Sequence, residues 1–124
     1  MGLRYVGIRV TDLGRSVRFY SELLGLKEAR RGRMHHGGYW VLLEDPRTRQ
    51  RLELNWYPPD HPFATPFAPG DGLDHIGFHV TNPRAAYRRL LRGGARPALA
   101  PEDAHGVRGV YYVLDPDNNW IEFF

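Results

Sequence analysis

The sequence contains no cysteine and, among its 17 basic residues, a single lysine, Lys27. The absence of cysteine excludes disulfides, thiolate chemistry and sulfur-ligated metal sites. No apolar run approaches the roughly 20 residues that a membrane-spanning helix requires. Residues 1–4 lead directly into a strand pattern and lack the features of a signal peptide. We therefore expect a cytoplasmic protein with no membrane partner.

The basic residues are spread along the chain, on predicted helix faces and in turns. The net charge is +3 and the isoelectric point is near 9.5, but the basic residues are spread among 14 acidic ones. A nucleic-acid site would need a stripe or patch of positive charge, so we expect no nucleic-acid partner. With 124 residues, of which 42% are apolar, the chain has the size and composition of one folded domain.

The chain contains an internal repeat with a period of about 70 residues. Residues 5–12 (YVGIRVTD) resemble residues 75–82 (HIGFHVTN), with Gly, Val and Thr at matching places. The Asp-Pro step at residues 45–46 recurs at residues 115–116, and Glu53 recurs as Glu122. The matches occur in the same order along the chain, which indicates a duplicated module.

Each copy shows the periodicities of a strand, a helix and three shorter strands. In the first copy a strand at 4–10 precedes a helix over about 14–24, which Asp12 caps and Gly25 ends. In the second copy Asn82 is the N-cap and Pro83 takes the first helical position. The shorter strands are expected at about 26–31, 37–44 and 50–56, and at about 96–99, 108–114 and 119–124.

Five prolines lie between the two copies, where they exclude a helix or an interior strand. We therefore predict a single domain over residues 1–124, with module 1 at about 1–57, a proline-rich connector at about 58–72 and module 2 at about 73–124. The predicted fold class is α+β: two tandem βαβββ modules form a curved, cup-like sheet with the helices on the outside.

Side chains alternate between the two faces of a strand, which separates apolar from polar positions. Val6, Ile8 and Val10 share the face that the first helix would cover. The polar and aromatic residues expected on the opposite, concave face are Tyr5, Arg9, Glu53, Asn55, His75, His79, Trp120 and Glu122.

Two carboxylates and histidines on one sheet face need charged or metal partners. A divalent ion satisfies two carboxylates and an imidazole at once, which favours a metal site made by Glu53, His75 and Glu122. The alternative from the residues alone is that both glutamates pair with arginines such as Arg9 or Arg51.

In this order and spacing, the motifs resemble those of the vicinal oxygen chelate superfamily, which includes glyoxalase I, fosfomycin-resistance proteins, bleomycin-binding proteins and extradiol dioxygenases. The similarity covers essentially the whole chain. The motifs that carry it are residues 8–12 (IRVTD), 19–20 (FY), 24–25 (LG), 52–54 (LEL), 74–78 (DHIGF), 115–117 (DPD) and 121–122 (IE).

The resemblance is strongest to glyoxalase I, whose four metal positions correspond to Tyr5, Glu53, His75 and Glu122. That family has His or Gln at the first position, so Tyr5 departs from the pattern. A tyrosine there would ligate the ion, hydrogen-bond a metal-bound water or fill space. The resemblance implies one divalent metal ion, with Ni, Zn, Co, Mn and Fe all compatible with nitrogen and oxygen ligands.

The resemblance also implies a lyase or isomerase, in which the metal binds two adjacent oxygens of a small substrate and stabilises an enediolate. Glu122 is the expected base and Glu53 its symmetric partner. Such proteins usually form homodimers, with sites completed by both modules within or between chains. The expected substrate-binding residues are Arg9, Asn55, His79, Trp120 and His105.

Two other functions remain open from the sequence. A protein of the bleomycin-resistance type would sequester an aromatic or planar ligand without a metal, which the aromatic content of 13% would suit. An enzyme related to extradiol dioxygenases would use two His and one Glu, with a His where Tyr5 stands. Fold alone does not choose among these functions or identify a substrate.

Overall fold

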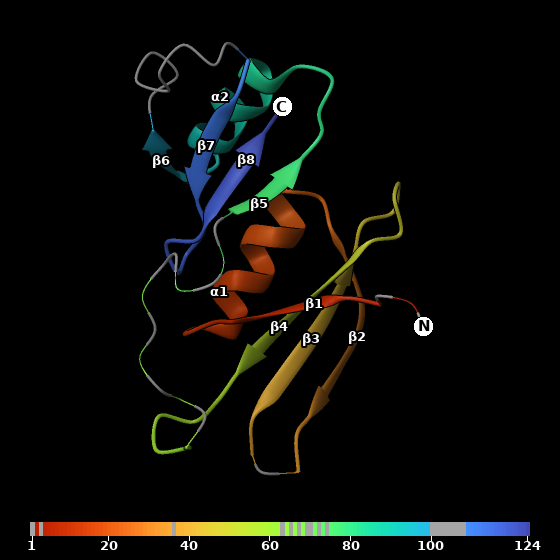
Figure 1. The fold of residues 1–124 in the computed structure, drawn as a ribbon, viewed down its shortest axis with the longest axis vertical. Helices are drawn as coiled ribbons and strands as arrows, with labels where there is room; N and C mark the ends of the chain where they lie inside the picture. Colours follow the sequence, from red (N-terminus) through yellow and green to blue (C-terminus); the bar gives the residue numbers. More distant parts are fainter. Residues whose placement is uncertain are drawn as a thin grey trace. The chain divides into compact units, whose positions relative to one another are not determined.

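The computed structural model of the chain describes residues 2, 4–35, 37–62, 64, 66, 68, 71, 73, 75–99 and 109–124. The chain forms two compact units, Met1–Pro66 and Phe67–Phe124. Within each unit the described residues form a four-stranded mixed sheet and a helical segment, as Figure 1 shows. No helix among the described residues is long and apolar enough to cross a membrane.

The first unit has the order strand, helix, then three strands. Its strands pair in the order β1-β4-β3-β2, with β1 parallel to β4 and the other neighbours antiparallel. Its elements are β1 (Val6–Arg9), α1 (Leu13–Arg18), the π-helical turn η1 (Phe19–Leu23), β2 (Lys27–Arg33), β3 (Tyr39–Glu44) and β4 (Arg51–Trp56).

The second unit repeats this topology. Its strands pair in the order β5-β8-β7-β6, and again the first and last strands, β5 and β8, are parallel. The α+β class and the duplicated βαβββ modules predicted from the sequence are therefore confirmed. The elements are β5 (His75–Phe78), α2 (Pro83–Arg92), β6 (Arg96–Leu99), β7 (Tyr111–Leu114) and β8 (Trp120–Phe123).

Both helices begin where the sequence predicts an N-cap. The Asp12 Oδ1 accepts a hydrogen bond from the Arg15 backbone N–H at 2.8 Å, and the Asn82 Oδ1 accepts one from the Ala85 N–H at 3.0 Å. The first helix differs from the continuous helix expected over 14–24. It widens into a π-turn after Arg18, where the Leu24 N–H donates to the carbonyl five residues back.

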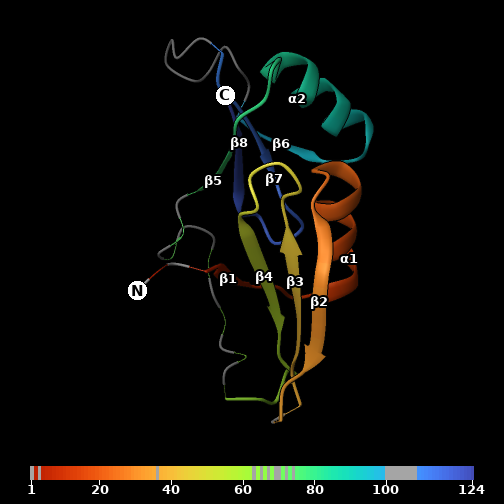
Figure 2. The ribbon, with the colours of Figure 1, turned by 90° about the vertical axis from the view of Figure 1, so that its right-hand side faces the viewer.

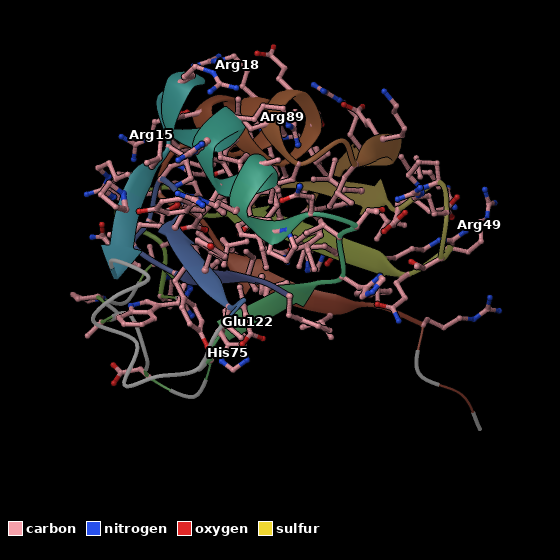
Figure 3. The ribbon with its side chains drawn as sticks, turned by 90° about the horizontal axis from the view of Figure 1, so that it is seen from above. Arg15, Arg18, Arg49, His75, Arg89 and Glu122 are labelled. Atoms are coloured by element: carbon pink, nitrogen blue, oxygen red, sulfur yellow. The ribbon has the colours of Figure 1, made fainter. Side chains whose placement is uncertain are left out.

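Each helix packs on one face of the sheet of its own unit, as Figure 2 shows. In β1, Ile8 and Val10 are buried as predicted. Val6, which we expected under the same helix, is 49% exposed because it begins the strand. The outer surfaces of the helices carry exposed arginines, including Arg89 on α2 (Figure 3).

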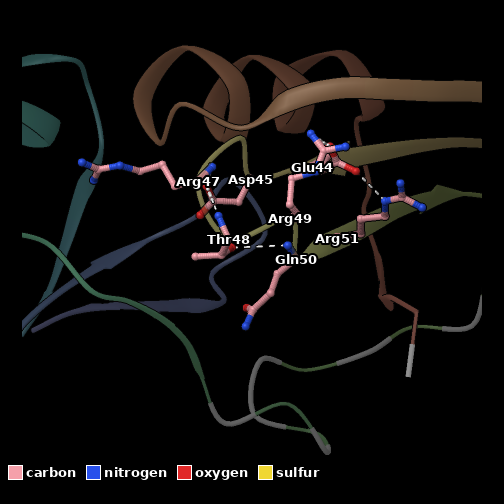
Figure 4. Close-up of polar contacts among 7 residues, drawn as sticks. All are labelled: Glu44, Asp45, Arg47, Thr48, Arg49, Gln50 and Arg51. Atoms are coloured by element: carbon pink, nitrogen blue, oxygen red, sulfur yellow. Dashed lines mark hydrogen bonds and ion pairs between the residues drawn. The ribbon is translucent and has the colours of Figure 1, made fainter. Parts of the chain in front are cut away.

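The β3–β4 hairpin is tied by a buried carboxylate. Glu44 is 8% exposed and accepts from the Arg49 Nη1 and the Arg51 Nε, both at 2.7 Å. The turn after it begins at Asp45, whose Oδ1 accepts from the backbone N–H groups of Arg47 at 2.8 Å and Thr48 at 3.4 Å (Figure 4). These hydrogen bonds pair two backbone N–H groups of the turn, which lies exposed to solvent.

The corresponding turn of the second unit is buried. Asp115 is fully buried and accepts from the Asp117 N–H at 2.8 Å, the Asn119 N–H at 2.8 Å and the Asn119 Nδ2 at 2.9 Å. Its carboxylate thus accepts the hydrogen bonds of three buried donors that water cannot reach. In the Asp45 turn the corresponding donors are exposed, and water can accept from them.

We predict that Asp115→Ala lowers the free energy of unfolding by about 3 kcal/mol or more, because buried donors lose their acceptor. The matched variant Asp45→Ala should cost about 1 kcal/mol, since water reaches the freed N–H groups. Urea denaturation followed by circular dichroism measures both losses. Equal losses in the two variants would contradict this account of the two turns.

Candidate functional site

The first and last strands of each module place a glycine beside a glutamate. In the parallel β1–β4 pair Gly7 is in register with Glu53, and in the β5–β8 pair Gly77 is in register with Glu122. A β-carbon built at Gly77 would lie 3.4 Å from the Glu122 Oε2. The missing side chain therefore leaves room for the carboxylate on the sheet face away from the helix.

Among the described residues of the second unit, Glu122 has the side chains of His75 and Tyr112 as partners. Its Oε2 lies 3.3 Å from the His75 Nε2, and its Oε1 accepts a hydrogen bond from the Tyr112 hydroxyl at 2.7 Å. The side chains of His75 and Glu122 are 38% and 18% exposed, respectively. Figure 3 shows the two side chains next to each other, projecting from β5 and β8.

Aromatic rings surround this carboxylate. The Tyr112 ring meets His75 edge to face at 6.1 Å between centroids and meets Trp120 at 5.4 Å. His79, the residue after β5, packs its ring against Phe124, the residue after β8, at 5.9 Å between centroids. Trp120 remains 38% exposed. The site combines a polar centre with an accessible aromatic rim.

In the first unit Glu53 is half-buried between strands β1 and β3. Its register partners are Gly7 on one side and Leu42 on the other. Within the described residues of this unit, no hydrogen bond or ion pair reaches its carboxylate. Asn55 lies two positions along the same strand, and its Nδ2 lies 3.1 Å from where a Gly7 β-carbon would be. Arg9 is in register with Asn55.

The two remaining predicted residues are Tyr5 and His105. Tyr5, the residue before β1, is 47% exposed. His105 lies outside the described residues. Within the described part of either unit, no three His, Asp or Glu side chains form a group that could hold a metal ion.

The donor chemistry of the His75–Glu122 pair fits a divalent ion. Ligand atoms about 2.1 Å from a metal lie roughly 3.0–3.4 Å apart at neighbouring coordination positions. The Nε2 and Oε2 atoms are 3.3 Å apart, so one ion can contact both without a large movement of either strand. Glu53 offers a further carboxylate of the type that such ions accept.

Tyr112 is a partner of Glu122 that the sequence analysis did not single out. It lies ten residues before Glu122, and the two are in register across the β7–β8 hairpin. The hairpin closes where the Asp115 N–H donates to the Asn119 carbonyl. Counting outward from that turn pairs Tyr112 with Glu122, so the pairing follows once the position of the turn is known.

Comparisons with known proteins place this geometry in a family. Residues 2–123 match the model of the Glyoxalase/Bleomycin resistance protein/Dioxygenase superfamily. The lactoylglutathione lyase of Neisseria meningitidis is 30% identical over 129 residues, which cover 99% of this chain and 89% of that protein.

Solved structures agree on the fold. The trypanothione-dependent glyoxalase I of Leishmania major superposes with a TM-score of 0.78 at 24% identity, covering 100% of this chain and 86% of that one. A variant of the fosfomycin resistance protein FosX from Listeria monocytogenes, complexed with Mn(II) and a dihydroxypropylphosphonic acid, gives 0.75 at 15% identity, covering 98% and 90%. With the family match over nearly its full length, the chain belongs to the Glyoxalase/Bleomycin resistance protein/Dioxygenase superfamily.

Proposed function

We propose that this protein is a metal-dependent lyase or isomerase of the glyoxalase I type, which acts on a small substrate with two adjacent oxygens. The observation that carries the proposal is the His75–Glu122 pair, an imidazole and a carboxylate 3.3 Å apart on an accessible sheet face. The 30% identity to a lactoylglutathione lyase supports the same reaction class.

In the proposed site Glu53, His75 and Glu122 hold one divalent ion. When bound, such an ion supplies a Lewis acid that polarises the adjacent substrate oxygens. The Glu122 Oε2, the oxygen that Tyr112 does not hold, would ligate the ion and, once it has left the ion, would take the proton from the carbon next to the carbonyl. Glu53 is the second carboxylate of the site.

The remaining residues of the non-helix faces contribute substrate contacts in this proposal. Arg9 supplies a fixed positive charge and Asn55 an amide, both of which suit a carboxylate-bearing group of the substrate. His79 and Trp120 provide a partly apolar wall, and His105 is a further candidate contact. We also propose that the chain works as a homodimer, the usual assembly implied by the family resemblance.

Metal binding is the first prediction of this proposal. Protein purified without chelator should carry one tightly bound divalent ion per chain, and Glu53→Ala/Glu122→Ala should lose it because two of three ligands are removed. Elemental analysis and equilibrium dialysis with Mn²⁺ measure this. The matched control is Glu22→Ala/Glu28→Ala, which removes the same charge from exposed positions and should keep the ion.

Substitution of the proposed base is the second prediction. Glu122→Gln should lower turnover of a hemithioacetal substrate by about 100-fold or more, since an amide cannot take the proton. Glu28→Gln is the control, with wild-type turnover expected. Near-normal turnover of Glu122→Gln, with the fold intact by circular dichroism, would remove this residue from the mechanism.

A metal-free binding protein of the bleomycin-resistance type is the second candidate function. Exposed aromatic rings favour it, since Trp120 on β8 and Phe124 directly after β8 are 38% and 48% exposed. A protein of this type would bind planar aromatic ligands with equal affinity before and after treatment with a chelator. A proposed enzyme depleted of metal would lose turnover.

The departure at Tyr5 gives a third prediction. If residue 5 faces the metal, Tyr5→His should raise the affinity for Mn²⁺ by about tenfold or more, because imidazole adds a good ligand. Tyr5→Phe should bind the ion as the wild type does, if the tyrosine does not ligate. Unchanged affinity in Tyr5→His would mean that residue 5 lies away from the ion.

A further inference from the structure

We propose that Tyr112 is a positioning residue of the metal site, which holds one oxygen of Glu122 so that the other is presented to the ion and to His75. This inference rests on the proposed function, because it concerns how a ligand of that site is oriented. Neither the sequence motifs nor the family resemblance pointed to Tyr112.

The two oxygens of Glu122 have different partners. The Tyr112 hydroxyl donates to Oε1 at 2.7 Å, the usual length for a hydroxyl–carboxylate hydrogen bond. Oε2 faces His75 at 3.3 Å. A carboxylate held in this way offers a single oxygen to an ion, so Tyr112 favours monodentate over bidentate ligation.

Tyr112 is itself held in place by packing. Its backbone is paired in register with Glu122 across the β7–β8 ladder. Its ring makes edge-to-face contacts with the rings of His75 and Trp120, at centroid distances of 6.1 and 5.4 Å, respectively. A half-buried ring with two aromatic neighbours has few rotamers open to it, so the hydroxyl is a fixed donor.

Among the described residues of the first module, no hydroxyl takes the place that Tyr112 has beside Glu122. The residue in register with Glu53 on the neighbouring antiparallel strand is Leu42, which has no hydrogen-bond donor in its side chain. The two glutamates therefore occupy matching positions in the duplicated sheets, but within the described residues only the carboxylate of Glu122 is held in one orientation by a hydrogen bond from the neighbouring strand. Glu122 is the oriented ligand of the pair, and the orientation comes from Tyr112.

Removal of the Tyr112 hydroxyl should weaken metal binding, because the Glu122 carboxylate would lose the hydrogen bond that orients it. Groups that hydrogen-bond to metal ligands typically change metal affinity by about 10–100-fold when they are removed. We expect Tyr112→Phe, which deletes only the hydroxyl, to weaken Mn²⁺ binding by about tenfold or more. Bound Co²⁺ should change its visible spectrum, because a freed carboxylate can shift toward bidentate ligation.

The chain provides a matched control in the preceding residue. Tyr111 lies on the opposite face of the same strand, where its ring packs against Tyr87 of α2 at 5.4 Å. Tyr111→Phe also removes one hydroxyl from β7 but leaves the polar face untouched. It should retain the wild-type Mn²⁺ affinity and Co²⁺ spectrum.

The experiment is equilibrium binding of Mn²⁺ and the visible spectrum of the Co²⁺-loaded protein, for wild type, Tyr112→Phe and Tyr111→Phe. Circular dichroism verifies that each variant is folded. Weakened binding and an altered spectrum in Tyr112→Phe alone would support the proposal. Wild-type affinity and spectrum in Tyr112→Phe would overturn it while the metal site stands. A wild-type protein that binds neither ion would overturn the proposed function itself, and the role of Tyr112 with it.

Discussion

The parallel pairing of the first and last strands is the constraint on which each module depends. A parallel pair cannot be joined by a tight turn, so the chain between β1 and β4 must leave the sheet and return. The helix and two further strands fill that path in both units. The same pairing brings Gly7 beside Glu53 and Gly77 beside Glu122. The positions of both carboxylates thus follow from the parallel pairing of the first and last strands in each sheet.

The apolar neighbours of the glutamates hold this register. Leu52 and Leu54 are 8% and 0% exposed on the helix side of β4, and Ile121 and Phe123 are 0% and 2% exposed on β8. A slip of one residue would turn these side chains to the open face and bury the carboxylate under the helix. Hydrophobic burial, at about 25 cal/mol for each Å² of apolar surface, therefore keeps each glutamate on the polar face.

The sequence predicted those features that depend on local pattern. The duplication, the Asp12 and Asn82 caps and the alternation around Glu53 are all expressed in spacing along the chain, and the caps agree with the structure. The π-turn after Arg18 was missed, because one extra residue in a helical turn barely disturbs the apolar period. Tyr112 was missed for a different reason. Its role depends on register across a hairpin and on a rotamer, neither of which periodicity encodes. The joining of Glu53 with the His75–Glu122 pair in one ligand set stays a prediction, since it depends on strands from two modules.

Duplication gave two equivalent carboxylates, and the residues around them have diverged. Glu122 already has a hydroxyl donor and an imidazole beside it, whereas the described residues of the first unit give Glu53 neither. A half-buried carboxylate without a partner retains much of its desolvation cost, and a cation offsets that cost directly. A cation near Glu122 instead meets atoms whose directions are already set.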